Sequence, residues 1–144
     1  MAAVAVLVGT SCGGNGGNGA NAPALVSIGA GLDGQRGLHA TVYARGIPRM
    51  SAFAFDSTGR LWVTASGATE HGADGVYLVR RAGATPLKVV SGIRGPLGLV
   101  WLKGRLYVSS LDGVVRFDSL SRDRFLRRTT ILRGPAVGAE NLPM

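Results

Sequence analysis

The sequence is poor in several features that would define a compact helical or disulfide-bonded domain. Its 144 residues include a single cysteine, Cys12, so no intramolecular disulfide can form. Only 6% of the residues are aromatic, and no stretch beyond the N-terminus shows convincing 3.6-residue hydrophobic periodicity. The apolar run 2–8 is much shorter than the roughly 20 residues that a membrane-spanning helix needs. The 23 glycines instead favour a fold with many turns.

Lysine is scarce as well, although the chain is basic. There are 16 Lys and Arg residues against 8 Asp and Glu, a formal net charge of +8, and only Lys88 and Lys103 are lysines. The arginines are dispersed along the chain, except in the segment 122–128 (RDRFLRR), which also contains an acid and two apolar residues. This pattern is typical of a solvated outer strand and its turn. We therefore expect no nucleic-acid partner.

The chain contains an internal repeat. The segment 59–63 reads GRLWV and the segment 104–108 reads GRLYV, 45 residues later, and each follows a short apolar run and a polar turn. Two further β-rich runs follow each copy, so each unit reads as four strands. A repeat of this length with four short strands is typical of a β-propeller blade. The sequence predicts an all-β partial propeller of about two to three four-stranded antiparallel blades over 25–144, with units at 51–96 and 97–135.

Other patterns refine this prediction. A trailing outer strand is expected at 39–46, after a possible edge strand at 25–28 and a loop at 29–37. The second strand of each unit, at 60–65 and 105–108, is apolar on both faces, as in strands that are covered twice. We expect Trp62 and Trp101 to provide much of the packing between units. Asp56 stands in a DSTG turn, where we expect it to cap the backbone rather than bind a metal.

Residues 1–24 are expected to be a disordered leader outside the folded domain. A short apolar run, small residues, Cys12 and a Gly/Asn-rich tether follow one another. This order resembles a bacterial lipoprotein signal, which implies lipidation of Cys12, export to the periplasm or cell surface, and attachment to a membrane surface. No positive residue precedes the apolar run, and Gly9 occupies a position where that family prefers Leu or Val. The alternative is an ordinary leader with an incidental cysteine.

The loop 66–74 carries the only cluster of acidic and imidazole groups in the chain: Glu70, His71 and Asp74. In a propeller, loops between strands two and three and loops between blades line one face, where ligands bind. The cluster could supply a general base or part of a metal site, or it could be solvated and without a role. His39 lies among β-forming residues, and we expect it to be structural.

The phrases FDSTGRLWV at 55–63 and GRLYVSS at 104–110, with GLVW at 98–101, resemble the N-terminal part of the glucose/sorbosone dehydrogenase-like propellers. The NHL-repeat and gluconolactonase-like six-bladed propellers share similar phrases. The resemblance covers residues 40–144. It implies a sugar as substrate and oxidation of a sugar hydroxyl with pyrroloquinoline quinone and calcium in full-length relatives. None of that family's ligands or catalytic residues can be placed on this sequence.

Two to three blades are too few to close a propeller, which needs roughly four to eight. We therefore expect this chain to be a fragment that is inactive by itself, with self-assembly into a ring as the less favoured alternative. Two other functions stay open at this stage. One is a non-catalytic extracytoplasmic NHL-type module that binds a protein or carbohydrate, and the other is a lactonase-like metal hydrolase.

Overall fold

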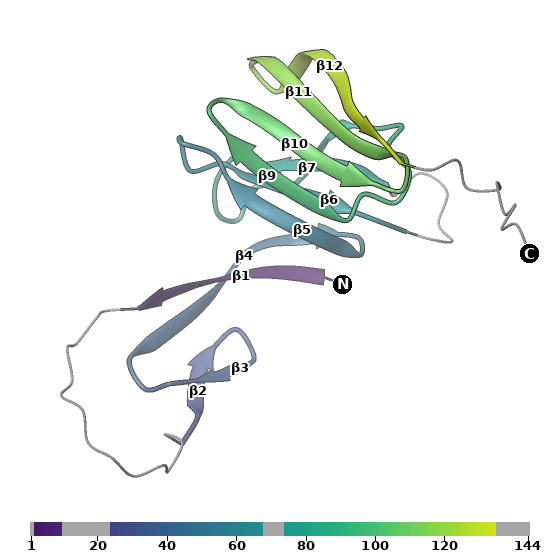
Figure 1. Cartoon of the computed structure of the whole chain (residues 1–144). Coiled ribbons are helices and arrows are strands. Elements are labelled where there is room, and N and C mark those ends of the chain that lie inside the picture. The colour runs from purple at the N-terminus through teal and green to yellow at the C-terminus, as the bar shows by residue number, and fades with distance from the viewer. Residues whose placement is uncertain (1, 10–23, 68–73, 135–144) are drawn as a thin grey trace, which may run out of the picture.

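The computed structural model describes residues 2–9, 24–67 and 74–134, with side chains from residue 24 onward. Within these ranges the chain is all-β, as predicted, and contains twelve strands (Figure 1). The strands are β1 Ala2–Gly9, β2 Val26–Gly29, β3 Leu32–Gly34, β4 Leu38–Ile47, β5 Met50–Phe55, β6 Leu61–Ala65, β7 Gly75–Val79, β8 Leu87–Val90, β9 Gly98–Leu102, β10 Arg105–Ser110, β11 Gly113–Ser121 and β12 Arg124–Arg133.

Two four-stranded antiparallel meanders form the body of the molecule. The first has the order β5-β6-β7-β8 and the second the order β9-β10-β11-β12. The two repeated pentapeptides form the second strand of each sheet, β6 and β10, in equivalent positions. The repeat in the sequence is therefore a repeat of topology, and we call the two sheets the first unit and the second unit.

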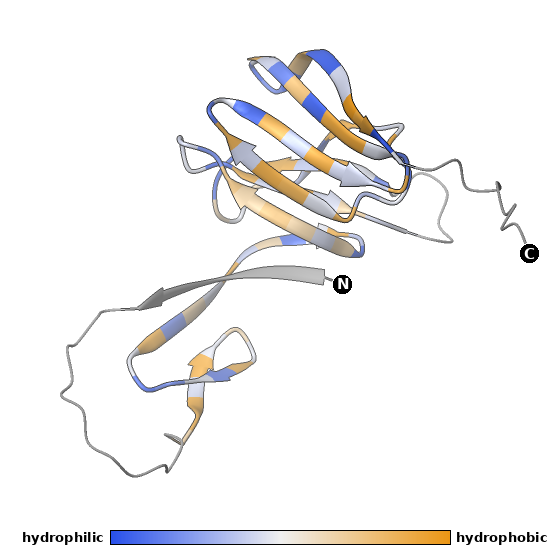
Figure 2. Ribbon diagram, viewed as in Figure 1, coloured by the Kyte–Doolittle hydropathy of each residue, from blue (hydrophilic) through white to orange (hydrophobic). Residues whose placement is uncertain are grey.

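The two units pack face to face through an apolar core (Figures 1 and 2). At its centre the rings of Trp62 and Trp101 stack with centroids 5.4 Å apart and planes 15° apart. Phe125 lies against Trp62 at 5.2 Å. The predicted role of the two tryptophans in packing between units is confirmed. The first unit contributes Trp62, Val76, Leu78, Val90 and Ile93, and the second unit Leu106, Val108, Val115 and Phe117.

The opposite face of the first unit is covered by β4. Ala44 and Ile47 of β4 pack on Leu61, Val63 and Val79. All five residues of β6 are consequently buried, which confirms the prediction of a strand covered on both faces. Phe53 and Phe55 lie on this same face, where the Phe55 ring contacts the Tyr43 ring of β4 with centroids 5.3 Å apart, and they are still 56% and 40% exposed.

The second unit differs, because no described residue packs on its outer face. Leu106 and Val108 are buried in the core, whereas Tyr107, on the other side of β10, is only half-buried. Figure 2 shows hydrophilic bands between hydrophobic ones along β11 and β12. The prediction that the second unit's middle strand is covered twice is therefore wrong within the described part of the chain, where a covering layer exists only for the first unit.

The N-terminal elements also correct two expectations. Ala2–Gly9 forms strand β1, which pairs antiparallel with β4, although the sequence placed it in a disordered leader. A run of Ala and Val fits a pleated strand, and β4 offers it a free edge. The expected loop 29–37 contains β3, which pairs with β2 in a hairpin. Its turn residues Ala30 and Gly31 both have positive φ, as two-residue hairpin turns require. None of the described residues forms a helix long and apolar enough to cross a membrane.

Candidate functional site

The loops that the sequence assigned to a single face do come together. The loops after β6, β8 and β10 meet at one end of the two units, where Leu111 N donates to Arg94 O at 3.2 Å and Leu97 N donates to Ser109 O at 3.0 Å. Ser51 Oγ of the first unit also donates to Pro96 O at 2.6 Å. These bonds fix the connection between the units against both sheets. We call this end the loop face.

Asp74 is the one predicted candidate that the structure describes. Its Oδ1 accepts a hydrogen bond from Gly67 N at 2.6 Å, and its Oδ2 accepts one from Gly95 N at 2.8 Å. Hydrogen bonds from Gly95 and Gly67 lower the pKa of Asp74, and the bond from Gly95 has the larger effect. The charge of Lys88 lowers this pKa further. A carboxylate held in this way ties two loops together and stays ionised. Its two oxygens are therefore engaged as structural acceptors rather than aimed at a substrate.

Glu70, His71 and Cys12 lie outside the described residues, so the predicted Glu-His-Asp cluster stays a prediction. His39 is in β4, paired with Val8, and its side chain is exposed. Among the described residues, no three His, Cys, Asp or Glu side chains lie close enough together to hold a metal ion.

Sequence reasoning missed the cavity beside Asp74. It measures about 420 Å³ and opens between the two units on the loop face. It is lined by Asp74, Lys88, Ser91, Gly92, Ile93, Arg94 and Asp112. We call it the loop-face cavity. Its residues come from β8 and from the loops after β6, β8 and β10, and no contiguous motif in the sequence could have identified it.

Two of the charged residues that line the loop-face cavity, Arg94 and Asp112, form an ion pair. Arg94 Nη2 lies 2.7 Å and Arg94 Nε 3.1 Å from Asp112 Oδ1, and both side chains are more than half exposed. An exposed pair of this kind contributes little to stability. Lys88 reaches over the Tyr77 ring, with its Nζ 5.9 Å from the centroid. The cavity thus presents a guanidinium donor beside a carboxylate acceptor, within reach of solvent.

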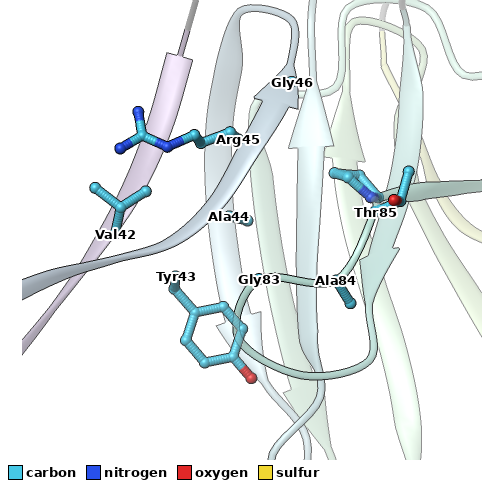
Figure 3. Close-up of a pocket in the computed structure, with 9 residues that line it drawn as sticks. Val42, Tyr43, Ala44, Arg45, Gly46, Gly83, Ala84 and Thr85 are labelled. Atoms are coloured by element: carbon cyan, nitrogen blue, oxygen red, sulfur yellow. The ribbon is translucent and has the colours of Figure 1, made fainter.

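A second cavity of about 400 Å³ lies between β4 and the turn that joins β7 to β8. Figure 3 shows Tyr43 beside the part of this turn that carries Gly83 and Ala84, while Arg45 points away from the turn. Gly83 N donates to Tyr43 O at 2.8 Å, and Tyr43 Oη donates to Gly59 O at 3.0 Å. These bonds attach β4 to the first unit. Arg45 is the only charged residue in this lining, so we assign this cavity a structural role.

Asp56 forms the predicted turn cap and also accepts hydrogen bonds from side chains. Its Oδ1 accepts from Thr58 N at 2.9 Å and Arg60 N at 3.1 Å, and its Oδ2 accepts from Arg60 Nε at 2.7 Å and Trp62 Nε1 at 2.9 Å. Burial raises the pKa of Asp56, but hydrogen bonds from Thr58, Trp62 and Arg60 outweigh burial and lower it from 3.8 to about 2. The carboxylate therefore also positions the indole of Trp62 in the core between the units.

Comparisons of the chain with protein-family models, with curated proteins and with solved structures found no match.

Proposed function

We propose that the chain is a propeller-type binding module whose loop-face cavity holds a small polyhydroxylated ligand, a sugar or a related polyol. The observation that carries this proposal is the adjacent Arg94 and Asp112 at the edge of the cavity. Neighbouring hydroxyl groups of a sugar each donate and accept hydrogen bonds, so they can bridge a guanidinium and a carboxylate. A volume of about 420 Å³ lies within the range of small-molecule sites.

The propeller part of the proposal is supported by the equivalence of the two units. Leu61 and Val63 in β6 pack toward the preceding strand β4, and Leu106 and Val108 in β10 pack in the same sense toward the preceding unit. The second unit thus covers the first in the same sense in which the first covers β4, as successive blades of a propeller cover one another. The sugar as ligand is also what the resemblance in sequence implies.

Binding can be measured by calorimetry with a panel of hexoses, pentoses and uronic acids. We expect at least one sugar to bind, and Arg94→Gln to weaken binding about tenfold or more, because a hydrogen bond from a charged donor is lost. The matched control is Arg81→Gln, which removes an exposed arginine at the turn between β7 and β8. If no sugar binds the unaltered protein, or if both variants weaken binding equally, the proposal is wrong.

Oxidation of a sugar hydroxyl with pyrroloquinoline quinone and calcium stays a prediction for full-length relatives. The described residues bring together no set of ligands for a metal ion, so we derive no step through that cofactor. Reduction of a redox dye by the chain with a sugar, the quinone and calcium would test it directly.

We also propose export and lipidation at Cys12, on the basis of the order of residues 1–24. Processing before Cys12 would remove β1, so a mature lipoprotein would lack the β1-β4 pair. The two fates of residues 2–9 therefore exclude each other in one molecule, and the mass of the N-terminal peptide distinguishes them.

A further inference from the structure

At the end of the molecule away from the loop face, the hairpin between β11 and β12 forms a groove with the start of β8. The groove measures about 510 Å³ and is lined by Leu87, Ser121, Arg122, Asp123, Arg124 and Leu126. We call it the hairpin groove. None of its residues belongs to the loop-face cavity or to the core between the units.

The hairpin groove combines two kinds of side chain. Leu126 is 71% exposed and Leu87 is 42% exposed, although both are large and aliphatic. Arg122 and Arg124 are exposed beside them, and among the described residues neither has an ion-pair partner. Exposed aliphatic groups next to unpaired guanidinium groups mark a contact surface rather than an ordinary solvated turn.

The hairpin is held in place by the first unit. Arg80 forms an ion pair with Asp123, with Arg80 Nε 3.3 Å from Asp123 Oδ1. Arg60 Nη1 also donates to Arg122 O at 3.4 Å. Asp123 therefore neutralises Arg80, and the charges of Arg122 and Arg124 remain in excess. Since the backbone that carries them is anchored, these two charges stay next to Leu87 and Leu126.

We propose that the hairpin groove is a contact site for an anionic lipid surface, independent of any lipid on Cys12. Arg122 and Arg124 would bind headgroup phosphates, and Leu126 and Leu87 would reach the acyl region. Basic residues next to exposed aliphatic ones are the composition that binds anionic bilayers. Single-stranded nucleic acid, the other polyanion, is bound through stacking on aromatic rings, and no residue of the groove is aromatic.

The test uses the full chain with Cys12→Ala, so that no lipid anchor is present, and measures sedimentation with vesicles. We expect binding to vesicles of phosphatidylglycerol and phosphatidylcholine in equal parts, little binding to phosphatidylcholine alone, and release by added salt. The Arg122→Asn/Arg124→Gln variant should bind about 30-fold more weakly, since each arginine near the surface adds one headgroup attraction. Asn is chosen because residue 122 has a φ of 53°, which Asn tolerates.

Two further variants complete the test. Leu126→Ser should weaken binding while the dependence on salt stays unchanged, because it removes apolar contact and no charge. Arg36→Gln/Arg45→Gln removes two exposed arginines from the β3–β4 region and should bind like the unaltered protein. Fluorescence of the stacked Trp62 and Trp101 checks that each variant is folded. Absence of binding to the anionic vesicles, or equal weakening in both double arginine variants, would overturn the proposal. Efficient competition by single-stranded DNA, together with no effect of Leu126→Ser, would overturn it as well.

Discussion

The carboxylate of Asp56 should make the stability of the fold depend on acid pH in a specific way. Its pKa is about 2 in the folded chain and 3.8 in the unfolded chain. A lowered pKa means that the ionised form stabilises the folded state, so the contribution is fully present above pH 3.8 and is lost as the pH falls toward 2. The difference between the two pKa values corresponds to about 2 kcal/mol.

The variant Asp56→Asn removes this contribution. Five donor atoms from the backbone and from side chains surround the two oxygens of Asp56, and an amide group must turn its NH₂ toward at least two of those donors. A buried donor left without an acceptor costs roughly 1–3 kcal/mol in addition. We therefore expect Asp56→Asn to lower the free energy of unfolding at pH 7 by about 3–5 kcal/mol.

Urea unfolding followed by tryptophan fluorescence, at several pH values between 7 and 2, measures both effects. The gap in stability between the unaltered protein and Asp56→Asn should narrow by about 2 kcal/mol as the pH falls through this window. Asp33→Asn, at an exposed acid in β3, is the control and should change neither value appreciably. A gap that is the same at pH 7 and pH 2 would refute the reasoning, because the carboxylate would then have no special stabilisation in the folded state.

Two further predictions concern the backbone and the N-terminus. Gly75→Ala and Gly113→Ala should each lower the free energy of unfolding by more than about 2 kcal/mol, since a Cβ would lie 2.2 Å from Val90 O or 2.0 Å from Leu132 O, both backbone atoms. Gly83→Ala, where a Cβ meets nothing within 4 Å, should cost only the roughly 1 kcal/mol of its positive φ, and urea unfolding that ranks the three alike would contradict this account. Cys12→Ala should release the chain from bacterial membranes that are washed at high salt. If the share of the chain in the washed membranes is unchanged, lipidation is wrong.

The sequence predicted the repeated units well because their signal is local. A turn with Gly and a run of apolar β-formers specify each second strand, and β6 and β10 occupy equivalent positions in two equal meanders. Asp56 and the two tryptophans were also predicted correctly, since a turn cap and a large apolar ring have few alternative placements.

The remaining features depend on contacts between segments that lie far apart in the sequence. Tyr107 has the apolar pattern of a strand covered twice, but burial requires a second layer, and none of the described residues supplies one. The sequence leaves Asp74 open as a general base, a metal ligand or a solvated residue without a role, whereas the structure places it between Gly67 and Gly95 as a backbone acceptor. The Arg94–Asp112 pair joins two loops from different units, and only the packing of the units brings them together.

The outer face of the second unit shows the same dependence. Asp118 is 7% exposed there, with Arg116 Nε 2.8 Å from its Oδ2 and Arg105 Nε 3.0 Å from its Oδ1. Oδ1 has no hydrogen-bond partner among the described residues, so the contact with Arg105 is an ion pair without hydrogen-bond geometry. The equivalent of Arg116 in the first unit is Leu78, which is fully buried. Equivalent strands of the two units thus carry apolar residues on this face in the first unit and charged residues in the second. A comparison of the two repeats alone does not reveal this difference.

Proton–proton contacts of the two indoles test most directly the stacking of one four-stranded unit on the other. In a nuclear Overhauser spectrum we expect cross-peaks between the ring protons of Trp62 and Trp101, and between those of Trp62 and Phe125, because the ring centroids lie 5.4 Å and 5.2 Å apart. Cross-peaks that connect each tryptophan only to residues of its own sheet would contradict the account.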